Sequence, residues 1–147
     1  MYSYLAPGLG LAGGNLERDL ATVMRLGAAH ETDTGIVKAW VENSVWRKGW
    51  AARTLKARVL DANPAARVAV LGLAYKQDTH STKNSPSLAL LSELGGIDVV
   101  VDDPVVPATA APVAVEAADG PMAAVTGADV LCIMTPWSPS KVLDPTD

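Results

Sequence analysis

The segment most suited to chemistry is a polar loop, residues 75–84, between an apolar run and a helix start. It carries Lys76 and Lys83, and Ser85 and Pro86 follow directly. Serine as N-cap with proline at the first helical position is typical of a helix N-terminus, where free backbone N–H groups attract phosphate. Two lysines before such a terminus indicate a phosphate-binding loop, and a solvated polar loop fits the same spacing equally well.

A second candidate is the glycine-rich run of residues 8–14. Gly8, Gly10 and Gly13 match the G-x-G-x-x-G spacing of a dinucleotide-binding turn. That motif needs a strand immediately before it, whereas only seven residues, ending in Pro7, precede this one. We therefore interpret the run as a loop rather than as a dinucleotide site.

Half of the twelve basic residues fall in one stretch, where Asp61 alone opposes them. They are Arg47, Lys48, Arg53, Lys56, Arg58 and Arg67. The pattern is typical of a solvated helix face, and it also fits a surface that meets anions. The whole chain of 147 residues has a net charge of −4, which argues against nucleic acid as its main partner.

Cysteine, histidine and apolar content exclude further classes of protein. Cys132 is the only cysteine, so no internal disulfide forms, and two histidines leave little for a metal site. We interpret Cys132 as a small core residue, His80 as a loop histidine, and a reduced cytoplasm as the compartment. No apolar run approaches the roughly 18 residues of a membrane span, and the first residues lack the pattern of a secretion signal.

Two helices are expected before residue 61. The first spans residues 15–29, with Asn15 as its cap and acidic residues in its first turn. The second spans residues 33–60 and carries Trp40, Trp46 and Trp50. Trp40 and Trp46 cannot share a narrow stripe, so the apolar surface is broad and a second subunit is a candidate to cover it.

After a break at residues 61–64 the pattern alternates between strand and helix. Strands are expected over 67–74, 97–101 and 129–134, and helices over 85–94 and 121–125, whereas 104–118 is weakly specified. This order predicts an α/β fold, with a parallel, Rossmann-like sheet following the helical segment. Ligands bind beyond the carboxyl ends of such strands, so residues 75–84, 102–103 and 135–137 should surround one crevice.

Four ordered segments resemble the UDP-glucose/GDP-mannose dehydrogenase family. The pattern G-x-G-F-G-G-S-C-F-P-K-D is similar to residues 8–19, V-L-G-L-A-F-K-P-D-T-D-D-x-R-E-S-P to 70–86, Y-D-P to 102–104, and A-D-A-V-V-I-L-T-E-W to 128–137. Members are nucleotide-sugar 6-dehydrogenases, oxidoreductases of polysaccharide biosynthesis that use two NAD to oxidise a 6-hydroxymethyl group to a carboxylate.

The resemblance implies an assignment for each part of the chain. Residues 1–62 correspond to part of the central helical dimerisation domain, with a homodimer contact through residues 33–60. Residues 63–147 correspond to the C-terminal, nucleotide-sugar-binding domain of Rossmann type. The NAD-binding domain is expected to lie outside these residues, so the cofactor would come from an upstream segment or a partner chain.

The resemblance also assigns roles to single residues. Substrate-binding positions are Gly8, Gly10, Gly13, Tyr75 and Lys76, the NAD contact is Lys83, and the catalytic positions are Asn15, Arg18 and Asp19. Asn15 stands at the family's cysteine position and is not competent, because an amide cannot form the covalent thiohemiacetal. Arg18 replaces a lysine and is a poorer proton-transfer group.

Three interpretations follow from these departures. The chain is the C-terminal part of a dehydrogenase, limited to two-electron alcohol oxidation with NAD supplied in trans. Alternatively, it is a non-catalytic nucleotide-sugar-binding or dimerisation module, or a remnant without selected activity. The sequence leaves the identity of the nucleotide sugar open.

Overall fold

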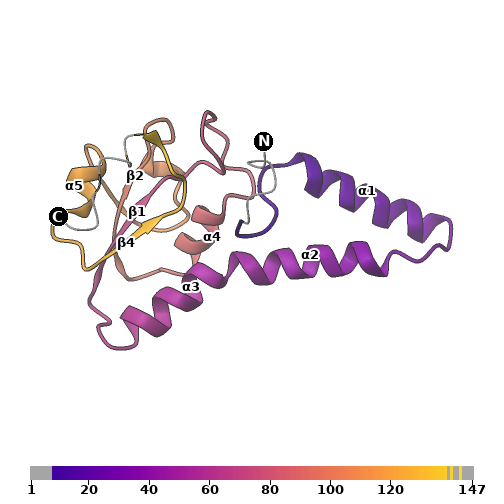
Figure 1. Cartoon of the computed structure of the whole chain (residues 1–147), viewed down its shortest axis with the longest axis horizontal. Coiled ribbons are helices and arrows are strands. Elements are labelled where there is room, and N and C mark those ends of the chain that lie inside the picture. The colour runs from indigo at the N-terminus through magenta and orange to yellow at the C-terminus, as the bar shows by residue number, and fades with distance from the viewer. Residues whose placement is uncertain (1–7, 139, 141–142, 144–147) are drawn as a thin grey trace.

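The computed structural model describes residues 8–138, 140 and 143 of the chain. A four-stranded parallel sheet with helices on both faces forms one end of the molecule, and a long helical hairpin extends away from it (Figure 1). The α/β fold expected from the sequence is therefore confirmed. Within the described residues, no helix is long and apolar enough to cross a membrane.

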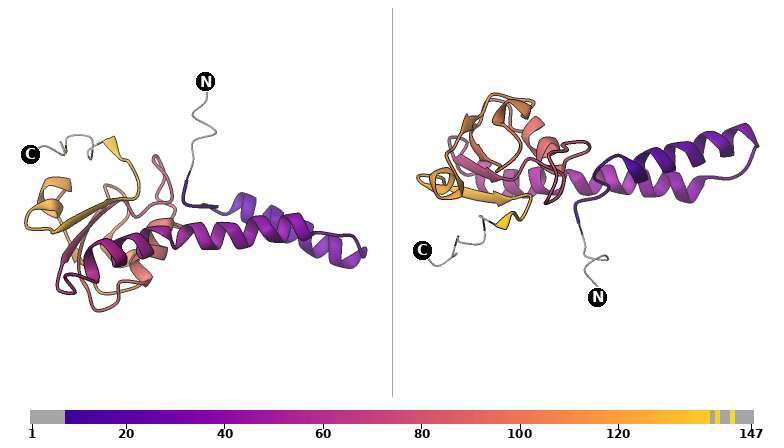
Figure 2. Two further views of the ribbon diagram at one scale, coloured as in Figure 1. Left: turned by 60° about the horizontal axis from the view of Figure 1, so that its bottom comes forward. Right: turned by 90° about the horizontal axis from the view of Figure 1, so that it is seen from above.

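The hairpin consists of α1 (Asn15–Ala29) and α2 (Gly35–Lys48), and both further views show it projecting from the sheet (Figure 2). The prediction that Asn15 caps the first helix is wrong. Gly14 is the N-cap and makes no side-chain cap hydrogen bond, so Asn15 is the first helical residue. In the turn between α1 and α2, the Asp33 carboxylate accepts a hydrogen bond from the Gly35 N–H at 2.8 Å.

The single helix predicted for residues 33–60 is interrupted. Gly49 separates α2 from a second helix, α3 (Trp50–Leu55). This helix continues into a π-helical turn, η2 (Lys56–Leu60). Glycine is a poor helix former, and the backbone at Gly49 departs from ideal helical values, with ψ at −4°. Figure 1 shows α3 bending away from the line of α2 toward the sheet. Ala51 and Leu55 of α3 lie in the core of the sheet domain, and Val59 and Leu60 of η2 pack against it.

The sheet consists of β1 (Arg67–Leu71), β2 (Asp98–Asp102), β3 (Glu116–Ala117) and β4 (Val130–Ile133), in the order β3-β2-β1-β4. Val68 pairs with Val99 and Val130, which fixes the register across the three longer strands. The strands expected over 67–74, 97–101 and 129–134 are thus present, although each is shifted or shortened. The two-residue β3 lies in the stretch 104–118, which the sequence specifies only weakly.

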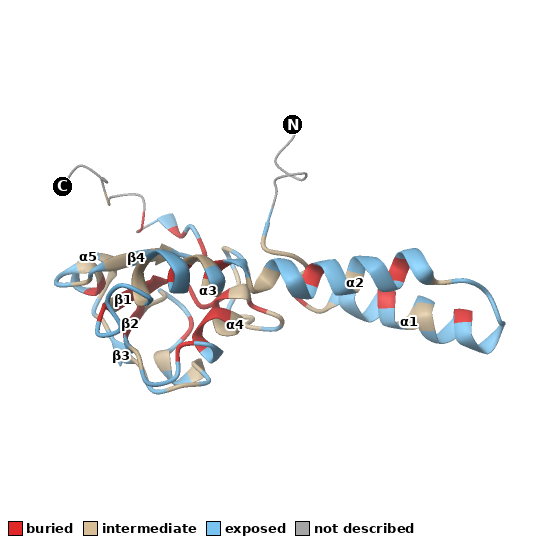
Figure 3. Cartoon of the chain, turned by 90° about the horizontal axis from the view of Figure 1, so that it is seen from below, coloured by how far each residue is buried: buried red, intermediate tan, exposed pale blue. Residues whose placement is uncertain are grey.

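Helices cover both faces of the sheet. Val68 and Val70 face α3 and α4 (Pro86–Ser92), whereas Ala69 and Leu71 face α5 (Pro121–Val125). The Ser85 side chain caps α4 by accepting from the Ser87 N–H, as the sequence predicts, but the helix ends at Ser92 rather than at the glycines. Figure 3 shows buried residues concentrated in this end of the molecule and a mostly exposed hairpin.

Most of the basic stretch finds partners within the chain. Arg47 donates to the Gly8 carbonyl, Lys56 pairs with Asp61 at 2.5 Å, and Arg67 contacts Asp98 and Glu116. Asp61 is therefore not the only carboxylate that opposes these cations, because the fold brings acidic residues of two strands to Arg67.

Candidate functional site

The glycine-rich loop, residues 8–14, is held between α2 and the polar loop, residues 75–84. On one side, Ser44 Oγ accepts from the Leu11 N–H at 2.7 Å. On the other side, the Gly13 N–H donates to the Lys83 carbonyl at 2.9 Å, and Asn84 Nδ2 donates to the Gly13 carbonyl at 2.8 Å. Two segments about 70 residues apart therefore form one structural unit, the loop pair.

Two of the three glycines in the G-x-G-x-x-G match lie so close to other protein atoms that a larger side chain would not fit. Gly10 has φ +93° and Gly13 has φ +74°, in the region that favours glycine. A Cβ at Gly10 would lie 2.6 Å from the Ser44 carbonyl oxygen, and one at Gly13 would lie 3.0 Å from the Tyr75 ring. Protein atoms occupy the open sides of these glycines, so this loop does not fit the pyrophosphate of a dinucleotide.

The loop pair brings together most of the residues that the sequence singles out for substrate and cofactor. The Tyr75 ring packs on Gly13, and the Lys83 side chain packs on Gly14. Lys76 Nζ lies 5.6 Å from the centroid of the Tyr75 ring. Lys76 therefore lies near the ring that covers Gly13, and Lys83 lies against the residue that caps α1. Ammonium groups beside an aromatic ring and loop backbone are suited to a phosphorylated ligand.

The predicted catalytic positions occupy the first turns of α1. Asn15, Arg18 and Asp19 are all exposed, and Arg18 Nη2 lies 3.5 Å from Asp19 Oδ1. Glu17, which no sequence motif singles out, is tied to the polar loop because Asn84 Nδ2 also donates to its carboxylate at 2.5 Å. Glu17 and Asn84 are far apart in the sequence, so no local sequence pattern predicts this contact.

Asp103 is the hydrogen-bonding centre of the carboxyl edge of the sheet, a role that sequence reasoning missed. Its Oδ2 accepts from the N–H groups of Leu73 and Ala74 and from Trp137 Nε1, at 2.6–3.0 Å. Its Oδ1 accepts from the N–H groups of Val105 and Val106 at 2.9 and 2.8 Å. Trp137 thus meets Asp103, and Gln77 of the polar loop donates to the Pro136 carbonyl, so the three segments predicted to surround one crevice lie together at this edge.

The pKa values of the neighbouring residues Asp102 and Asp103 are shifted in opposite directions. Burial pushes the pKa of Asp103 upward, but four backbone N–H donors outweigh it, so the pKa of Asp103 lies below its ordinary value. Burial and the charge of Asp103 together raise the pKa of Asp102. Asp103 is therefore held as a carboxylate that serves the fold.

Cys132 is the only cysteine of the chain and lies in β4. Burial raises the pKa of the Cys132 thiol in β4, so this group stays protonated and is a weak nucleophile. Among residues 8–138, 140 and 143, no three His, Cys, Asp or Glu side chains gather as a set of metal ligands.

A match to a known protein family establishes the family of this chain. Residues 69–147 match the UDP-binding domain of the UDP-glucose/GDP-mannose dehydrogenase family, which is more than half of the chain. The chain belongs to this family. It is 32% identical over 144 residues to a UDP-glucose 6-dehydrogenase of Pseudomonas aeruginosa and 28% identical over 145 residues to one of Rhizobium meliloti. These alignments cover 91% and 96% of the chain.

Solved structures of family members resemble the structure of this chain. A UDP-glucose dehydrogenase from the hyperthermophilic archaeon Pyrobaculum islandicum superposes with a TM-score of 0.82 at 26% identity, over 97% of the chain. A UDP-D-ManNAc dehydrogenase from Pyrococcus horikoshii gives a TM-score of 0.67 at 28% identity, over 88% of the chain. The chain spans about a third of the length of these family members.

Proposed function

We propose that the chain binds the nucleotide part of a nucleotide sugar at the loop pair, as a component of an NAD-dependent nucleotide-sugar 6-dehydrogenase. The observation that carries this is the hydrogen bond between Gly13 and Lys83, which joins the glycine-rich loop to the polar loop. The match to the family's UDP-binding domain supports the same ligand class.

Each group in the loop pair has a role that follows from its chemistry. Lys76 and Lys83 supply positive charge for the diphosphate, and Tyr75 supplies a ring for packing against the ligand. Arg18 and Asp19 lie near the start of α1, where they can orient the sugar and hold a water molecule. The activity would belong to the cytoplasm and to polysaccharide biosynthesis.

NAD does not fit the described residues as a resident cofactor. The open sides of Gly10 and Gly13 are filled by Ser44 and Tyr75. Lys83 is the one residue that the resemblance assigns to NAD, and it provides a single positive charge. When bound, NAD supplies the hydride acceptor of such a dehydrogenase. We therefore assign NAD binding to a domain outside these residues and route no step through it.

A second candidate is a non-catalytic nucleotide-sugar-binding or dimerisation module. Asn15 favours it, because this position carries an amide where the family has its cysteine nucleophile. Cys132, the only thiol, lies in β4 and has a raised pKa. The four-electron route through a covalent thiohemiacetal is closed to this chain.

We expect the purified chain to bind one nucleotide sugar and not NAD. Calorimetric titration with UDP-glucose, UDP-glucuronate, GDP-mannose and NAD tests this directly. Lys76→Ala should weaken binding about tenfold or more, since a charge-assisted hydrogen bond contributes about 1.5–3 kcal/mol. Lys38→Ala, which removes an exposed cation on α2, should leave affinity unchanged. Equal losses in both variants would contradict a site at the loop pair.

We expect no NAD-dependent oxidation by the chain alone, because the thiol nucleophile is missing and NAD has no site among the described residues. The measurement is NADH absorbance with UDP-glucose and NAD present. A sustained rise in absorbance would exclude the non-catalytic interpretation.

We also expect a homodimer through residues 33–60. Ile36 and Trp40 on α2 are 64% and 56% exposed, and the hairpin also exposes Val23 and Leu26. Apolar surface of this extent favours a protein partner. Light scattering at micromolar concentration should give twice the mass of the chain, and Ile36→Glu should shift it to monomer. A monomeric wild-type chain would refute the dimer.

A further inference from the structure

Asn84 links the polar loop to both the glycine-rich loop and α1. Its Nδ2 group donates to the Gly13 carbonyl at 2.8 Å and to Glu17 Oε2 at 2.5 Å. An amide NH2 group has two hydrogens, so one is available for each acceptor. A carboxylate of the same size could accept hydrogen bonds but not donate them, so it could not replace this amide. We call Asn84 together with Glu17 the amide bridge.

The backbone of Asn84 is anchored next to the sheet. Asn84 has φ +53°, in the left-handed region that asparagine and aspartate adopt more readily than most other residues. The next residue, Ser85, is buried, and its N–H donates to the Thr82 carbonyl at 3.0 Å. The Ser85 hydroxyl donates to the Leu73 carbonyl at 2.7 Å. The amide of Asn84 therefore projects from a fixed backbone, which limits where its hydrogen bonds can point.

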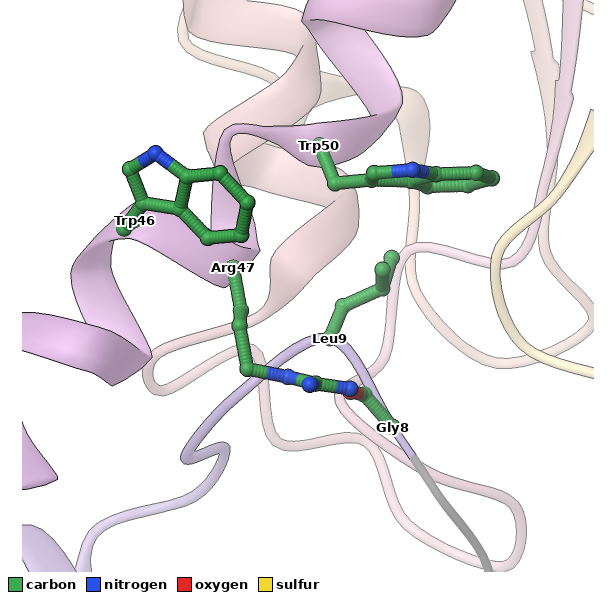
Figure 4. Close-up of a pocket in the computed structure, with 5 residues that line it drawn as sticks. All are labelled: Gly8, Leu9, Trp46, Arg47 and Trp50. Carbon is green, nitrogen blue, oxygen red and sulfur yellow. The ribbon is translucent and has the colours of Figure 1, made fainter.

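The two ends of the glycine-rich loop are held by different parts of the molecule. At its start, Arg47 donates through Nε and Nη2 to the Gly8 carbonyl, at 3.2 and 2.7 Å. Figure 4 shows this side chain reaching from α2 to Gly8, beside a cavity of about 410 Å³. At the other end, Gly13 is held by the Lys83 carbonyl and by Asn84. The position of α1 relative to the polar loop thus depends on this second contact, in which the amide bridge supplies the side chains.

The amide bridge brings a negative charge to a site proposed for an anion. Glu17 is an exposed residue in the first turn of α1. By charge alone it would repel a diphosphate at the loop pair and weaken binding. A favourable effect of Glu17 on binding therefore has to come from its contact with Asn84 and not from its charge.

The amide bridge is particular to this chain. The family patterns that residues 8–19 and 70–86 resemble have proline at position 17 and glutamate at position 84. A proline side chain offers no acceptor and a carboxylate offers no donor, so those residue types cannot form this contact.

We propose that Asn84 is a positioning residue for the nucleotide-sugar site. Through Glu17 it fixes the start of α1 relative to Lys83. Arg18 and Asp19, which follow Glu17, are thereby aligned with the polar loop. A ligand that combines a diphosphate with a sugar contacts both parts at once, so their alignment before binding reduces the entropy that is lost. This inference rests on the function proposed for the loop pair.

Calorimetric titration of the full chain with UDP-glucose tests the sign of the Glu17 effect. Glu17→Ala removes the acceptor at a position where alanine favours the helix. We expect affinity to fall about fivefold, whereas relief of charge repulsion alone would raise it. Glu17→Gln keeps an acceptor oxygen for Asn84 and should stay within about twofold of wild type. UDP lacks the sugar and should lose less affinity than UDP-glucose in Glu17→Ala. An affinity for UDP-glucose that is unchanged or raised in Glu17→Ala would overturn the proposal.

Asn84→Asp is the isosteric test of the donor. The variant keeps the shape of the side chain and tolerates the left-handed backbone, but it loses both donors and sets a carboxylate against Glu17. Affinity for UDP-glucose should fall about tenfold or more. Asn63→Asp adds the same charge at an exposed residue outside the loop pair, and should leave affinity unchanged. Equal losses in the two variants would attribute the effect to net charge and overturn the proposal.

Hydrogen exchange of the Gly13 amide, followed by NMR, distinguishes the amide bridge from the proposed function because it needs no ligand. The Gly13 N–H donates to the Lys83 carbonyl, so loss of the adjacent bridge should open this contact more often. We expect exchange about tenfold faster in Asn84→Asp than in Asn63→Asp. Unchanged exchange would overturn the bridge whether or not a ligand binds. Absence of UDP-glucose binding by the wild-type chain would refute the proposed function, and faster exchange in Asn84→Asp would still support the bridge.

Discussion

Replacing Asp103 by asparagine is expected to destabilise the fold by about 3 kcal/mol. The carboxylate accepts five hydrogen bonds from four backbone N–H groups and the Trp137 indole. An amide can keep its oxygen toward one set of donors, but its NH2 group then faces the other set. Buried N–H groups without partners cost about 1–3 kcal/mol each. Urea unfolding at neutral pH measures the difference.

Asp102→Asn is the matched control. Asp102 is the adjacent residue, and its pKa is raised by burial and by the charge of Asp103. Removing its charge relieves that repulsion, so stability should change little or increase slightly. A large loss in this variant, comparable to that of Asp103→Asn, would show that any change at this edge disrupts packing.

The same pair predicts how stability varies with pH. Because the folded-state pKa of Asp103 is lowered, its contribution is complete above the unfolded-state pKa of about 3.9 and is lost as pH falls through the folded value. The raised pKa of Asp102 acts in the opposite sense, since its contribution is present in acid and is lost as pH rises. The gap between wild type and Asp103→Asn should therefore close in acid. A constant gap would contradict the ionised role.

Gly72→Ala is expected to destabilise the fold by about 3 kcal/mol or more. Gly72 follows β1 with φ +90°, and a Cβ there would lie 2.4 Å from the Thr135 Cβ and 2.7 Å from the Thr135 backbone N. Thr135 is buried, and its hydroxyl donates to the Ala74 carbonyl at 2.5 Å. It cannot move away without losing this bond, so alanine must displace backbone.

Gly96→Ala separates the two causes. Gly96 has φ +84°, close to that of Gly72, but no heavy atom lies within 4 Å of its added Cβ. It therefore carries the backbone penalty alone, about 1 kcal/mol. Thermal unfolding of both variants should show a much larger loss at Gly72. Equal losses would mean that the contact with Thr135 is relieved at little cost.

The sequence by itself determined the elements and their order. Helix periodicity predicted α1, although it placed the cap at Asn15 instead of Gly14. Ser85 with Pro86 marked the start of α4, because capping depends on near neighbours. The alternation of strand and helix predicted the parallel sheet. Residue types and local spacing singled out the two loops that carry Gly13 and Lys83, but they say nothing about the contact between the loops.

Tertiary structure decided which of these residues meet. Gly13 contacts Lys83, and Asp103 contacts Trp137, across separations that no local pattern encodes. The cap at Gly14 and the pairing of Arg67 with Asp98 and Glu116 also depend on packing and on strand register. Local signals act over one helical turn, whereas these contacts exist only once the sheet has fixed its register. For that reason the residues of the candidate site could be named from the sequence, but their arrangement could not.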